Sequence, residues 1–226
     1  MPDQGFRSSI PFLEPEQALA EGIVAVGGRL DVGTLYEAYR RGIFPWPQEG
    51  LPMLWFSPPE RGVLFFDELH IPRRAKELLK TKDLYRFTQN QALPQVLEFC
   101  QKQPRPGQDG TWILDEMIEA YQNFHQAGFV RSFEVWQGKE LVGGLYGVFL
   151  QGVFSGESMF HRQTDGSKRA LLYAIEILQN EGLHWIDTQM VTPVVGAFGG
   201  RLIPRAEYLK MLKDAQDQWR QRTAKV

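Results

Sequence analysis

Asp187 and Gln189 stand two positions apart in the stretch 183–190, which we expect to be a strand. Residues two apart on a strand face the same side of a sheet, so the carboxylate and the amide are expected to lie together. A carboxylate can attract a cation or take up a proton, whereas a neutral amide is too weakly basic for that and orients a partner through hydrogen bonds. The two residues are therefore candidates for a site that handles a polar or charged group.

Glu157 is a further candidate because it is an acidic residue in an apolar stretch. It lies between two small residues and close to Phe154 and Met159. A carboxylate in such surroundings costs free energy unless a partner balances it. Two explanations stay open: the carboxylate accepts hydrogen bonds from a bound ammonium group, or it forms an internal salt bridge with Arg162 or Lys168.

The sequence shows no pattern of metal ligands. Cys100 is the single cysteine, so the chain can form no intrachain disulfide and has too few thiols for a zinc ribbon. The histidines are scattered and match no metal-binding spacing: His70, His125, His161 and His184. We therefore expect no metal, and the lone cysteine fits a reducing cytosol.

Basic residues are concentrated in two segments, although the net charge of the chain is −2. Residues 71–82 carry five basic side chains against one acidic, and residues 201–226 carry seven against three. Such patches on an acidic body steer polyanions to one face, and they also occur as ordinary solvated helix faces. Charge alone leaves both explanations open.

Several of the six tryptophans fall in short stretches rich in glycine and proline. Trp46 lies in GIFPWP and Trp112 lies in DGTWI. A tryptophan on a loop is available to stack on a base or a sugar, and it can equally close the end of a core.

The elements that must position these residues alternate between helices and strands after residue 60. Hydrophobic periodicity, turns and caps predict a strand at 63–66, helices at 70–82, 93–101 and 115–126, strands at 132–136, 141–150 and 153–160, a helix at 168–180 capped by Ser167, a strand at 183–190 and a helix at 204–222. Before residue 60 we expect a short helix over 34–41. The five prolines of 45–59 predict a segment without regular structure.

This order predicts an α+β fold with a small N-terminal domain, residues 1–60, and a second domain, residues 61–226. The second domain has the strand order of a GNAT-like (N-acetyltransferase-like) mixed sheet with flanking helices. Proteins of that fold that use acetyl-CoA hold its pyrophosphate on a Gln/Arg-x-x-Gly-x-Gly/Ala turn. The corresponding turn here, RQTDGSK at 162–168, ends in lysine where a small residue is expected and adds the negative charge of Asp165, which argues against CoA.

Ordered motifs along nearly the whole chain resemble those of leucyl/phenylalanyl-tRNA–protein transferases. They are GIVAVGGRL (22–30), AYRRGIFPW (38–46), LWFSPPER (54–61), DGTWI (109–113), LVGGLYGVFLQGVFSGESMF (141–160), SKRALL (167–172), IDTQ (186–189) and IPRAEYL (203–209). RGIFPW and GESMF are specific in combination.

The resemblance implies an enzyme that moves leucine, phenylalanine or methionine from aminoacyl-tRNA to the α-amine of an N-terminal arginine or lysine on an acceptor protein. The aminoacyl ester is already activated, so no cofactor is expected. An α-amine has a reference pKa of about 7.7–8.0, so a useful fraction is neutral at cellular pH. The enzyme mainly has to position two substrates and manage one proton. The implied product is an N-terminus that marks the protein for degradation.

The resemblance also implies roles for individual residues. Asp187 would attract the acceptor's cationic residue or take a proton, Gln189 would orient the amine or the oxyanion, and Glu157 would orient the aminoacyl group. The aminoacyl pocket would contain Leu145, Phe154, Met159 and Ile186, each of which equally suits plain core packing. The adenosine and aminoacyl contacts would be Trp46, Trp112 and Tyr121. The tRNA-binding residues would be Arg73, Arg74, Lys76 and Lys80.

The stretch 192–201, TPVVGAFGGR, departs from the family pattern. Family members commonly carry a histidine where Val194 stands, followed by Ser-Leu-Gly-Ala. Ala174 stands where some relatives carry an aromatic residue, so a wider pocket is expected. Two alternatives follow: a CoA-dependent N-acyltransferase of the same fold, and a non-catalytic relative that binds tRNA or peptide.

Composition places the protein among ordinary globular proteins, with 43% hydrophobic and 23% charged residues. No apolar run approaches the roughly 18 residues of a membrane helix, and the first ten residues do not resemble a secretory signal. We therefore expect a cytoplasmic protein without a membrane partner, and a monomer.

Overall fold

The computed structural model describes residues 5–48, 50–104, 111 and 113–224 of the chain. Trp112, one of the predicted adenosine contacts, lies outside the described residues. No helix within the described ranges is long and apolar enough to cross a membrane.

The N-terminal part contains a three-stranded sheet and one α-helix. The strands are β1 (Ile23–Val26), β2 (Phe44–Trp46) and β3 (Leu54–Phe56), in the order β1-β3-β2, and a 3-10 turn, η1, spans Pro15–Gln17. Helix α1 (Val32–Arg40) begins after Asp31, whose side chain accepts a hydrogen bond from the backbone N–H of Thr34 at 2.8 Å. This cap explains why the helix begins at Val32, two residues before the predicted start at 34.

The prediction that residues 45–59 lack regular structure was wrong, because β2 and β3 both lie in this segment. Pro45 is part of β2, which is an edge strand of the small sheet, whereas the central strand β3 contains no proline. An edge strand tolerates the missing N–H of proline because one of its sides forms no ladder.

The larger sheet has seven strands in the order β10-β4-β9-β8-β7-β6-β5. Its strands are β4 (Glu60–Phe65), β5 (Arg86–Gln89), β6 (Val130–Gln137), β7 (Glu140–Leu150), β8 (Val153–His161), β9 (Trp185–Gln189) and β10 (Arg201–Pro204). Strands β8 and β9 run parallel, with Ser155 opposite Asp187, and the other neighbouring pairs are antiparallel. The expected mixed sheet is thus confirmed.

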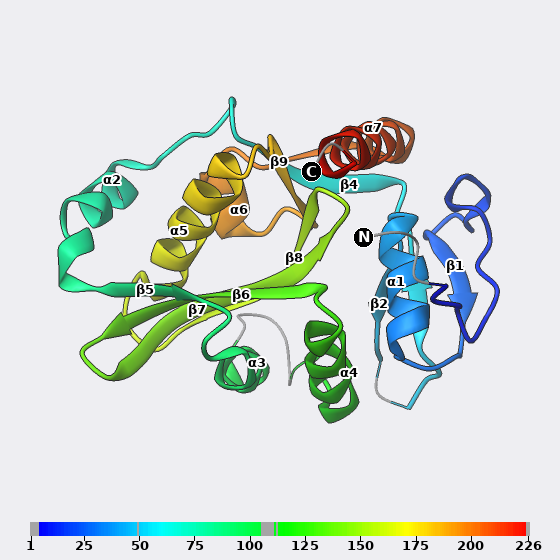
Figure 1. Cartoon of the computed structure of the whole chain (residues 1–226), viewed down its shortest axis with the longest axis horizontal. Helices are drawn as coiled ribbons and strands as arrows, with labels where there is room; N and C mark the ends of the chain where they lie inside the picture. Colours follow the sequence, from blue (N-terminus) through cyan, green and yellow to red (C-terminus); the bar gives the residue numbers. More distant parts are fainter. Residues whose placement is uncertain (1–4, 49, 105–110, 112, 225–226) are drawn as a thin grey trace.

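Helices cover both faces of this sheet (Figure 1). Helix α5 (Gly166–Asn180), which connects the parallel strands, packs on β6, β7 and β8. On the opposite face, α3 (Leu93–Lys102) packs on β7 and β8, and α4 (Asp115–Gln126) packs on β6 and on α1. The remaining helices are α2 (Arg73–Lys80), followed by the 3-10 turn η2 (Lys82–Leu84), α6 (Pro193–Ala197) and α7 (Arg205–Thr223). Strand β8 therefore lies between two covered faces.

Three local predictions differ from the structure. Helix α5 starts at Gly166, one residue before the expected cap Ser167, because Asp165 turns the chain at a φ of 65°. A Cβ at position 166 would lie 2.4 Å from the carbonyl oxygen of Val142, so this close approach to β7 requires glycine. The expected loop after β9 contains α6 and β10, and the unpredicted β5 forms the far edge of the sheet. Strands of four residues depend on their pairing partners more than on local propensity.

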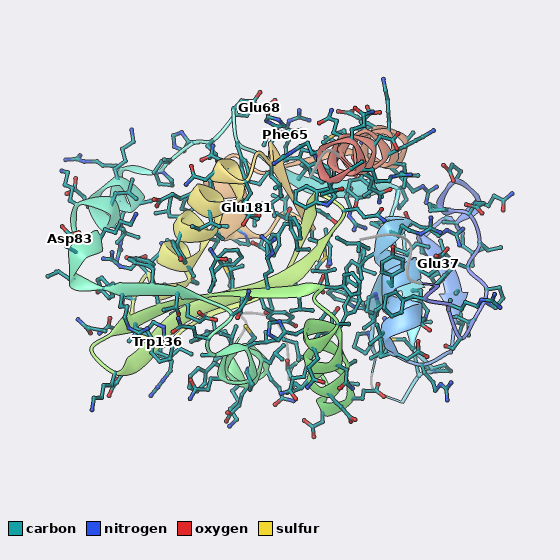
Figure 2. The ribbon with its side chains drawn as sticks, in the orientation of Figure 1. Glu37, Phe65, Glu68, Asp83, Trp136 and Glu181 are labelled. Carbon is teal, nitrogen blue, oxygen red and sulfur yellow. The ribbon has the colours of Figure 1, made fainter. Side chains whose placement is uncertain are left out.

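Glu134 on β6 is a buried carboxylate that joins three elements. Its Oε1 accepts hydrogen bonds from the Ser132 hydroxyl at 2.6 Å and from the backbone N–H of Ala92, at the start of α3, at 3.3 Å. Its Oε2 accepts a hydrogen bond from the hydroxyl of Thr88 on β5, which in turn accepts one from the Trp136 indole at 2.8 Å. Figure 2 shows Trp136 on the side of the molecule away from Glu37 of α1. The carboxylate thus ties the edge of the sheet to the N-terminus of a helix.

Replacing this carboxylate by an amide, Glu134→Gln, is expected to lower the free energy of unfolding by about 1–3 kcal/mol. The amide nitrogen cannot accept a hydrogen bond, so at least one of the buried donors around Glu134 loses its acceptor. Urea unfolding measures the change, with Glu140→Gln at the exposed start of β7 as the matched control, expected to stay within about 0.5 kcal/mol of the parent. Equal stabilities of the two variants would contradict the conclusion that the Glu134 carboxylate holds the sheet edge to the start of α3.

Candidate active site

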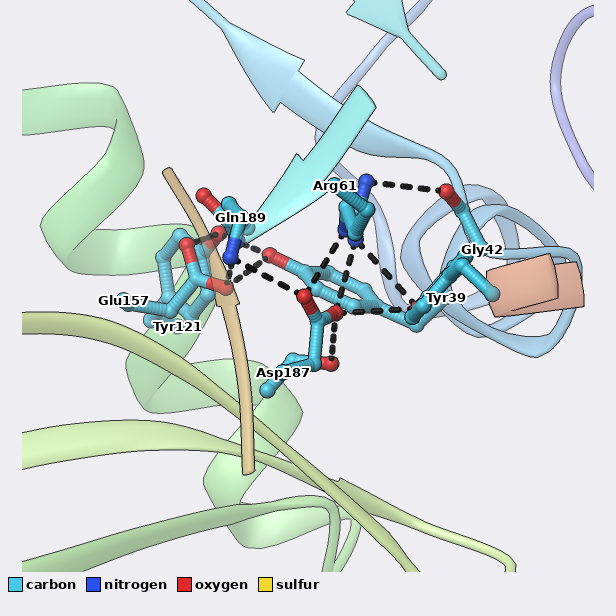
Figure 3. Close-up of polar contacts among 9 residues, drawn as sticks. Tyr39, Gly42, Arg61, Tyr121, Glu157, Asp187 and Gln189 are labelled. Atoms are coloured by element: carbon cyan, nitrogen blue, oxygen red, sulfur yellow. Dashed lines mark hydrogen bonds and ion pairs between the residues drawn. The ribbon is translucent and has the colours of Figure 1, made fainter. Parts of the chain in front are cut away.

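A buried ion pair between Arg61 on β4 and Asp187 on β9 lies where both parts of the chain meet (Figure 3). The guanidinium donates through Nε to Oδ1 at 2.8 Å and through Nη2 to Oδ2 at 2.7 Å. The two side chains are 2% and 0% exposed. The Ser155 hydroxyl, at 2.9 Å, and the Tyr208 hydroxyl, at 3.0 Å, also donate to Oδ2. This pair is bidentate and hydrogen-bonded at its remaining oxygen positions, as a buried ion pair requires.

Arg61 connects the ion pair to the N-terminal part of the chain. Its Nη1 donates to the carbonyl oxygen of Gly42 at 3.2 Å, and its guanidinium carbon lies 4.6 Å from the ring centres of both Phe44 and Tyr208. Planar stacking of this kind suits arginine and not lysine. The residue therefore fixes the small sheet, β9 and α7 in one arrangement.

Asp187 is a buried carboxylate that stays ionised beside Arg61. Burial alone would raise the pKa of this carboxyl, but the charge and hydrogen bonds of Arg61 hold the pKa below its ordinary value, so it stays ionised. Its cationic partner lies inside the chain, and its side chain has no exposed surface. In this arrangement the carboxylate contacts Arg61, Ser155 and Tyr208, and its expected role at an acceptor's N-terminus stays a prediction.

Gln189 ends β9 in a left-handed backbone conformation, with a φ of 59°. Its backbone N–H donates to Oδ1 of Asp187 at 3.0 Å, and its Nε2 donates to Oε1 of Glu157 at 2.7 Å. The carboxylate of Asp187 thus holds the strained backbone that aims the amide. The side-chain groups of the two residues meet different partners, Arg61 and Glu157, and their joint action on a substrate stays a prediction.

Glu157 on β8 is at the centre of a second polar cluster, with Tyr39 of α1 and Tyr121 of α4. The hydroxyl of Tyr39 donates to Oε1 at 2.7 Å, that of Tyr121 donates to Oε2 at 3.0 Å, and the two hydroxyl oxygens lie 2.6 Å apart. Burial raises the pKa of Glu157 to about 7, although the hydrogen bonds from the two tyrosines act in the opposite direction. A carboxyl with such a pKa is suited to proton transfer near neutral pH.

Among the described residues, Glu157 forms no salt bridge with Arg162 or Lys168, which was one of the two explanations considered for it. Lys168 donates to Oδ1 of Asp165 at 2.7 Å, and Arg162 lies over the ring of Phe99 at 5.0 Å. Glu157 is the partly buried member of the polar cluster, whereas both tyrosines are buried. It is therefore the group through which the cluster can meet a substrate.

The four predicted pocket residues lie together in one apolar cluster under α5. Leu145, Phe154 and Ile186 are 5%, 1% and 2% exposed, and the partly buried Met159 packs against the same cluster and pairs with Leu145 across β7 and β8. In this arrangement they form core, so an amino-acid side chain can enter only where these side chains move apart. Their role in binding stays a prediction.

Trp46 and Tyr121, two of the predicted adenosine and aminoacyl contacts, differ in how far they are buried. Trp46 at the end of β2 is partly buried and lies edge-on to Phe44, with ring centres 6.5 Å apart. Tyr121 is fully buried, and its hydroxyl belongs to the Glu157 cluster. The ring of Tyr121 has no exposed surface in this arrangement, and its role as an adenosine or aminoacyl contact stays a prediction.

The basic segment forms helix α2, at the far end of the large sheet from α1 (Figure 1). Arg74 pairs with Asp165 at 2.9 Å and Lys80 pairs with Glu77 at 2.8 Å. Arg73 and Lys76 are exposed and take part in no ion pair among the described residues. These two side chains are the freest to contact a polyanion.

Four residues of the polar clusters were missed in the sequence: Tyr39, Arg61, Ser155 and Tyr208. Each lies inside one of the motifs that resemble the family: AYRRGIFPW, LWFSPPER, LVGGLYGVFLQGVFSGESMF and IPRAEYL respectively. The signal was therefore available as a polar residue within a specific motif, but its partners are up to 147 positions away. Among the described residues, no group of three or more His, Cys, Asp or Glu side chains could hold a metal ion.

Comparisons with known proteins cover most of the chain. The family model described as "Leucyl/phenylalanyl-tRNA protein transferase" matches residues 63–213, and the model of its N-terminal domain matches residues 28–59. Relatives of this chain include three proteins named leucyl/phenylalanyl-tRNA–protein transferase. The protein of Oleidesulfovibrio alaskensis is 43% identical over 91% of this chain and 85% of its own length, and that of Anaeromyxobacter sp. is 44% identical over 92% of this chain and 88% of its own length. The protein of Methylococcus capsulatus is 45% identical over 90% of this chain and 86% of its own length. A solved structure, that of L-PGS from Bacillus licheniformis, is similar at a TM-score of 0.39 and 11% identity over 65% of this chain and 45% of its own, which is too remote to bear on function.

Proposed function

Because the chain belongs to the leucyl/phenylalanyl-tRNA–protein transferase family, we propose that it moves leucine, phenylalanine or methionine from charged tRNA to the α-amine of an N-terminal arginine or lysine. The chain is an aminoacyltransferase, and its substrates are an aminoacyl-tRNA and a protein. The choice of donor amino acids and of acceptor residues is the proposal. The observation that carries it is the match of both family models along the chain, with Glu157, Asp187 and Gln189 joined in one hydrogen-bonded centre.

The proposed reaction joins the acceptor's nitrogen to the ester carbonyl carbon and releases the ribose oxygen. Gln189 orients the amine or the developing oxyanion, because its amide is held in place by Glu157 at one end and by Asp187 at its backbone. Asp187 and Arg61 position Gln189 and do not contact the substrate. Trp46 and Trp112 are proposed to contact the terminal adenosine, and the cluster of Leu145, Phe154, Met159 and Ile186 to receive the amino-acid side chain.

The α5 N-terminus argues against CoA as the donor. Oδ1 and Oδ2 of Asp165 accept hydrogen bonds from Lys168 and Arg74 at 2.7 and 2.9 Å. Burial alone would raise the pKa of Asp165, but these hydrogen bonds hold it below its ordinary value, so the carboxylate is ionised at neutral pH. Asp165, Lys168 and Arg74 thus pair with one another at the turn where proteins of this fold that use acetyl-CoA hold its pyrophosphate.

We further propose that α2 contacts the tRNA backbone. Reversing two charges, Arg73→Glu with Lys76→Glu, is expected to weaken tRNA binding at every salt concentration and to reduce the slope of log K against log[salt] by about 2, because each basic residue releases about one counterion. Filter binding across a salt series measures both quantities. Lys210→Glu with Lys213→Glu on α7 is the matched control, and an equal effect of the two double variants would move the tRNA surface away from α2.

The proposed substrates are tested by a matrix of transfer reactions. Leu-, Phe-, Met- and Val-tRNA with labelled amino acids are offered to peptides that differ only in an N-terminal arginine, lysine or glutamate. We expect label on the arginine and lysine peptides from the first three donors, and none from Val-tRNA, whose side chain branches at Cβ. Binding of all charged tRNAs without transfer would favour a non-catalytic relative, and transfer from labelled acetyl-CoA would favour the N-acyltransferase alternative.

We also propose that the protein works in the cytoplasm as a monomer and that its product marks proteins for degradation. The cytoplasm supplies charged tRNA and nascent or processed protein N-termini. The 1–60 and 61–226 domain division stays a prediction; the ion pair and hydrogen bonds of Arg61 tie residues on both sides of it together.

A further inference from the structure

The hydrogen bonds around Glu157 need one proton more than the ionised groups supply. Three contacts close a ring: Tyr39 to Glu157 at 2.7 Å, Tyr121 to Glu157 at 3.0 Å, and Tyr39 to Tyr121 at 2.6 Å. Each contact requires one hydrogen between its two oxygens. The two phenols supply two hydrogens and an ionised carboxylate supplies none. However the hydrogens are arranged, one pair of oxygens then meets without a hydrogen.

A protonated Glu157 supplies the missing hydrogen. The carboxyl then donates to one tyrosine, that tyrosine donates to the other, and the second donates back to the carboxyl, so each of the three contacts holds one hydrogen. The hydrogen bonds in such a closed chain polarise and strengthen one another. Burial, followed by the charge of Glu157, raises the pKa of Tyr39 and Tyr121 well above the ordinary value, so the phenols stay protonated and the exchangeable proton belongs to the carboxyl.

The buried ion pair of Arg61 and Asp187 is not part of the ring formed by Glu157, Tyr39 and Tyr121. Gln189 of β9 donates to Glu157 from outside the ring at 2.7 Å. Asp187 and Arg61 bind each other, and their effects on Glu157 oppose one another, since Asp187 raises its pKa and Arg61 lowers it. Tyr146 of β7 packs edge-on against Tyr121, with ring centres 5.5 Å apart. Of these groups, the carboxyl of Glu157 is the one that can change its charge near neutral pH.

We propose that Glu157, Tyr39 and Tyr121 share one proton in a closed ring, and that this ring is the proton acceptor of aminoacyl transfer. In the ionised ring, one contact lacks a hydrogen. The attacking amine forms the new N–C bond and gives one proton to the ring, which completes the three contacts. When the C–O bond to ribose breaks, the ring returns that proton to the leaving oxygen and is ionised again. The inference rests on the proposed transfer and deepens it, because it assigns the proton acceptor to a ring that includes two tyrosines.

The shared proton is tested first without any substrate. Glu157→Gln keeps the shape of the side chain and supplies the third hydrogen from its amide, so the variant ring is complete at every pH. A carboxyl whose pKa is higher in the folded chain than in the unfolded chain stabilises the fold at low pH and loses that contribution as the pH rises to the folded value. Urea unfolding is therefore measured at pH 5, 6, 7, 8 and 9 for the parent and the variant.

We expect the folding equilibrium constant of the parent, relative to Glu157→Gln, to fall by up to about tenfold per pH unit between pH 5 and 7 and to level off above pH 7. Glu119→Gln, at an exposed position of the same helix as Tyr121, is the matched control and should give a flat ratio. A flat ratio for Glu157→Gln would overturn the shared proton.

The role in transfer is tested by single-turnover rates from pH 5.5 to 9. The parent rate should rise with a component near pH 7 that does not move when the acceptor carries a less basic α-amine, and Glu157→Gln should lack this component. Tyr39→Phe and Tyr121→Phe, which open the ring, should slow transfer, whereas Tyr36→Phe, one helical turn before Tyr39, should not. Identical pH profiles for the parent and Glu157→Gln would overturn the proton acceptor. A parent that transfers no amino acid would instead refute the proposed function, and the unfolding series would still decide the shared proton.

Discussion

Replacing Arg61 with methionine is expected to lower the free energy of unfolding by about 3–5 kcal/mol, because it leaves the carboxylate of Asp187 buried without its charge partner. The substitution keeps a long apolar stem between Phe44 and Tyr208 and removes the bonds to Asp187 and Gly42. Chemical unfolding of the parent and the variant at pH 7 measures the change. The expected loss is a large part of the stability of a domain of this size.

An ion pair on the surface serves as the control that shows how much of the expected loss of stability comes from burial of the charge. Arg201 pairs with Glu68 at 3.0 Å, but the two side chains are 45% and 47% exposed. Arg201→Met is therefore expected to cost no more than about 1 kcal/mol. Adding Asp187→Asn to Arg61→Met should restore part of the lost stability, because no uncompensated charge remains. Equal effects of Arg61→Met and Arg201→Met would mean that the buried pair does not hold the site together.

The second large effect is expected on the rate of transfer. Glu157→Gln should lower the single-turnover rate by about 10²–10⁴-fold, the usual contribution of a positioned proton acceptor. Binding of Leu-tRNA should change little, because the amide is isosteric with the carboxyl and keeps partners in Tyr39, Tyr121 and Gln189. The rate is measured with enzyme in excess over Leu-tRNA, and the donor affinity is measured separately by filter binding.

Glu119→Gln is the control for the loss of one negative charge and should keep the parent rate. If Glu157→Gln instead loses donor affinity in proportion to its rate, the residue orients the aminoacyl group, as the family resemblance implies, and does not accept the proton. A variant with the parent rate and the parent affinity would exclude both roles.

The sequence predicted best the elements whose signals are local. Helix α4 has the predicted bounds, 115–126, since its apolar residues repeat with the helical period and Gly128 follows it. Strands β7 and β8 are long apolar runs joined by a glycine turn, and they agree within one residue. Strands β1, β2, β3, β5 and β10 were missed because three- or four-residue strands are fixed by their partners in the sheet.

The site was predicted only in part, for the same reason. Glu157, Asp187 and Gln189 are found in one hydrogen-bonded centre. The pairing of Arg61 with Asp187, 126 positions later, has no local pattern, and it is the basis for proposing that the aspartate positions Gln189. The turn at Gln189, with a φ of 59°, also has no signature in a stretch that otherwise fits a strand. Alternation along a strand therefore brought Asp187 and Gln189 together in the prediction but could not identify their partners, Arg61 and Glu157.

The most direct test of the account is transfer of labelled leucine from Leu-tRNA to a peptide that begins with arginine. The same peptide with an acetylated N-terminus, and labelled acetyl-CoA as an alternative donor, are run in parallel. The account predicts label on the free-amine peptide, from Leu-tRNA and not from acetyl-CoA, and none on the acetylated peptide. Label on the free-amine peptide from acetyl-CoA, or no transfer from Leu-tRNA by a folded protein that binds it, would contradict the account.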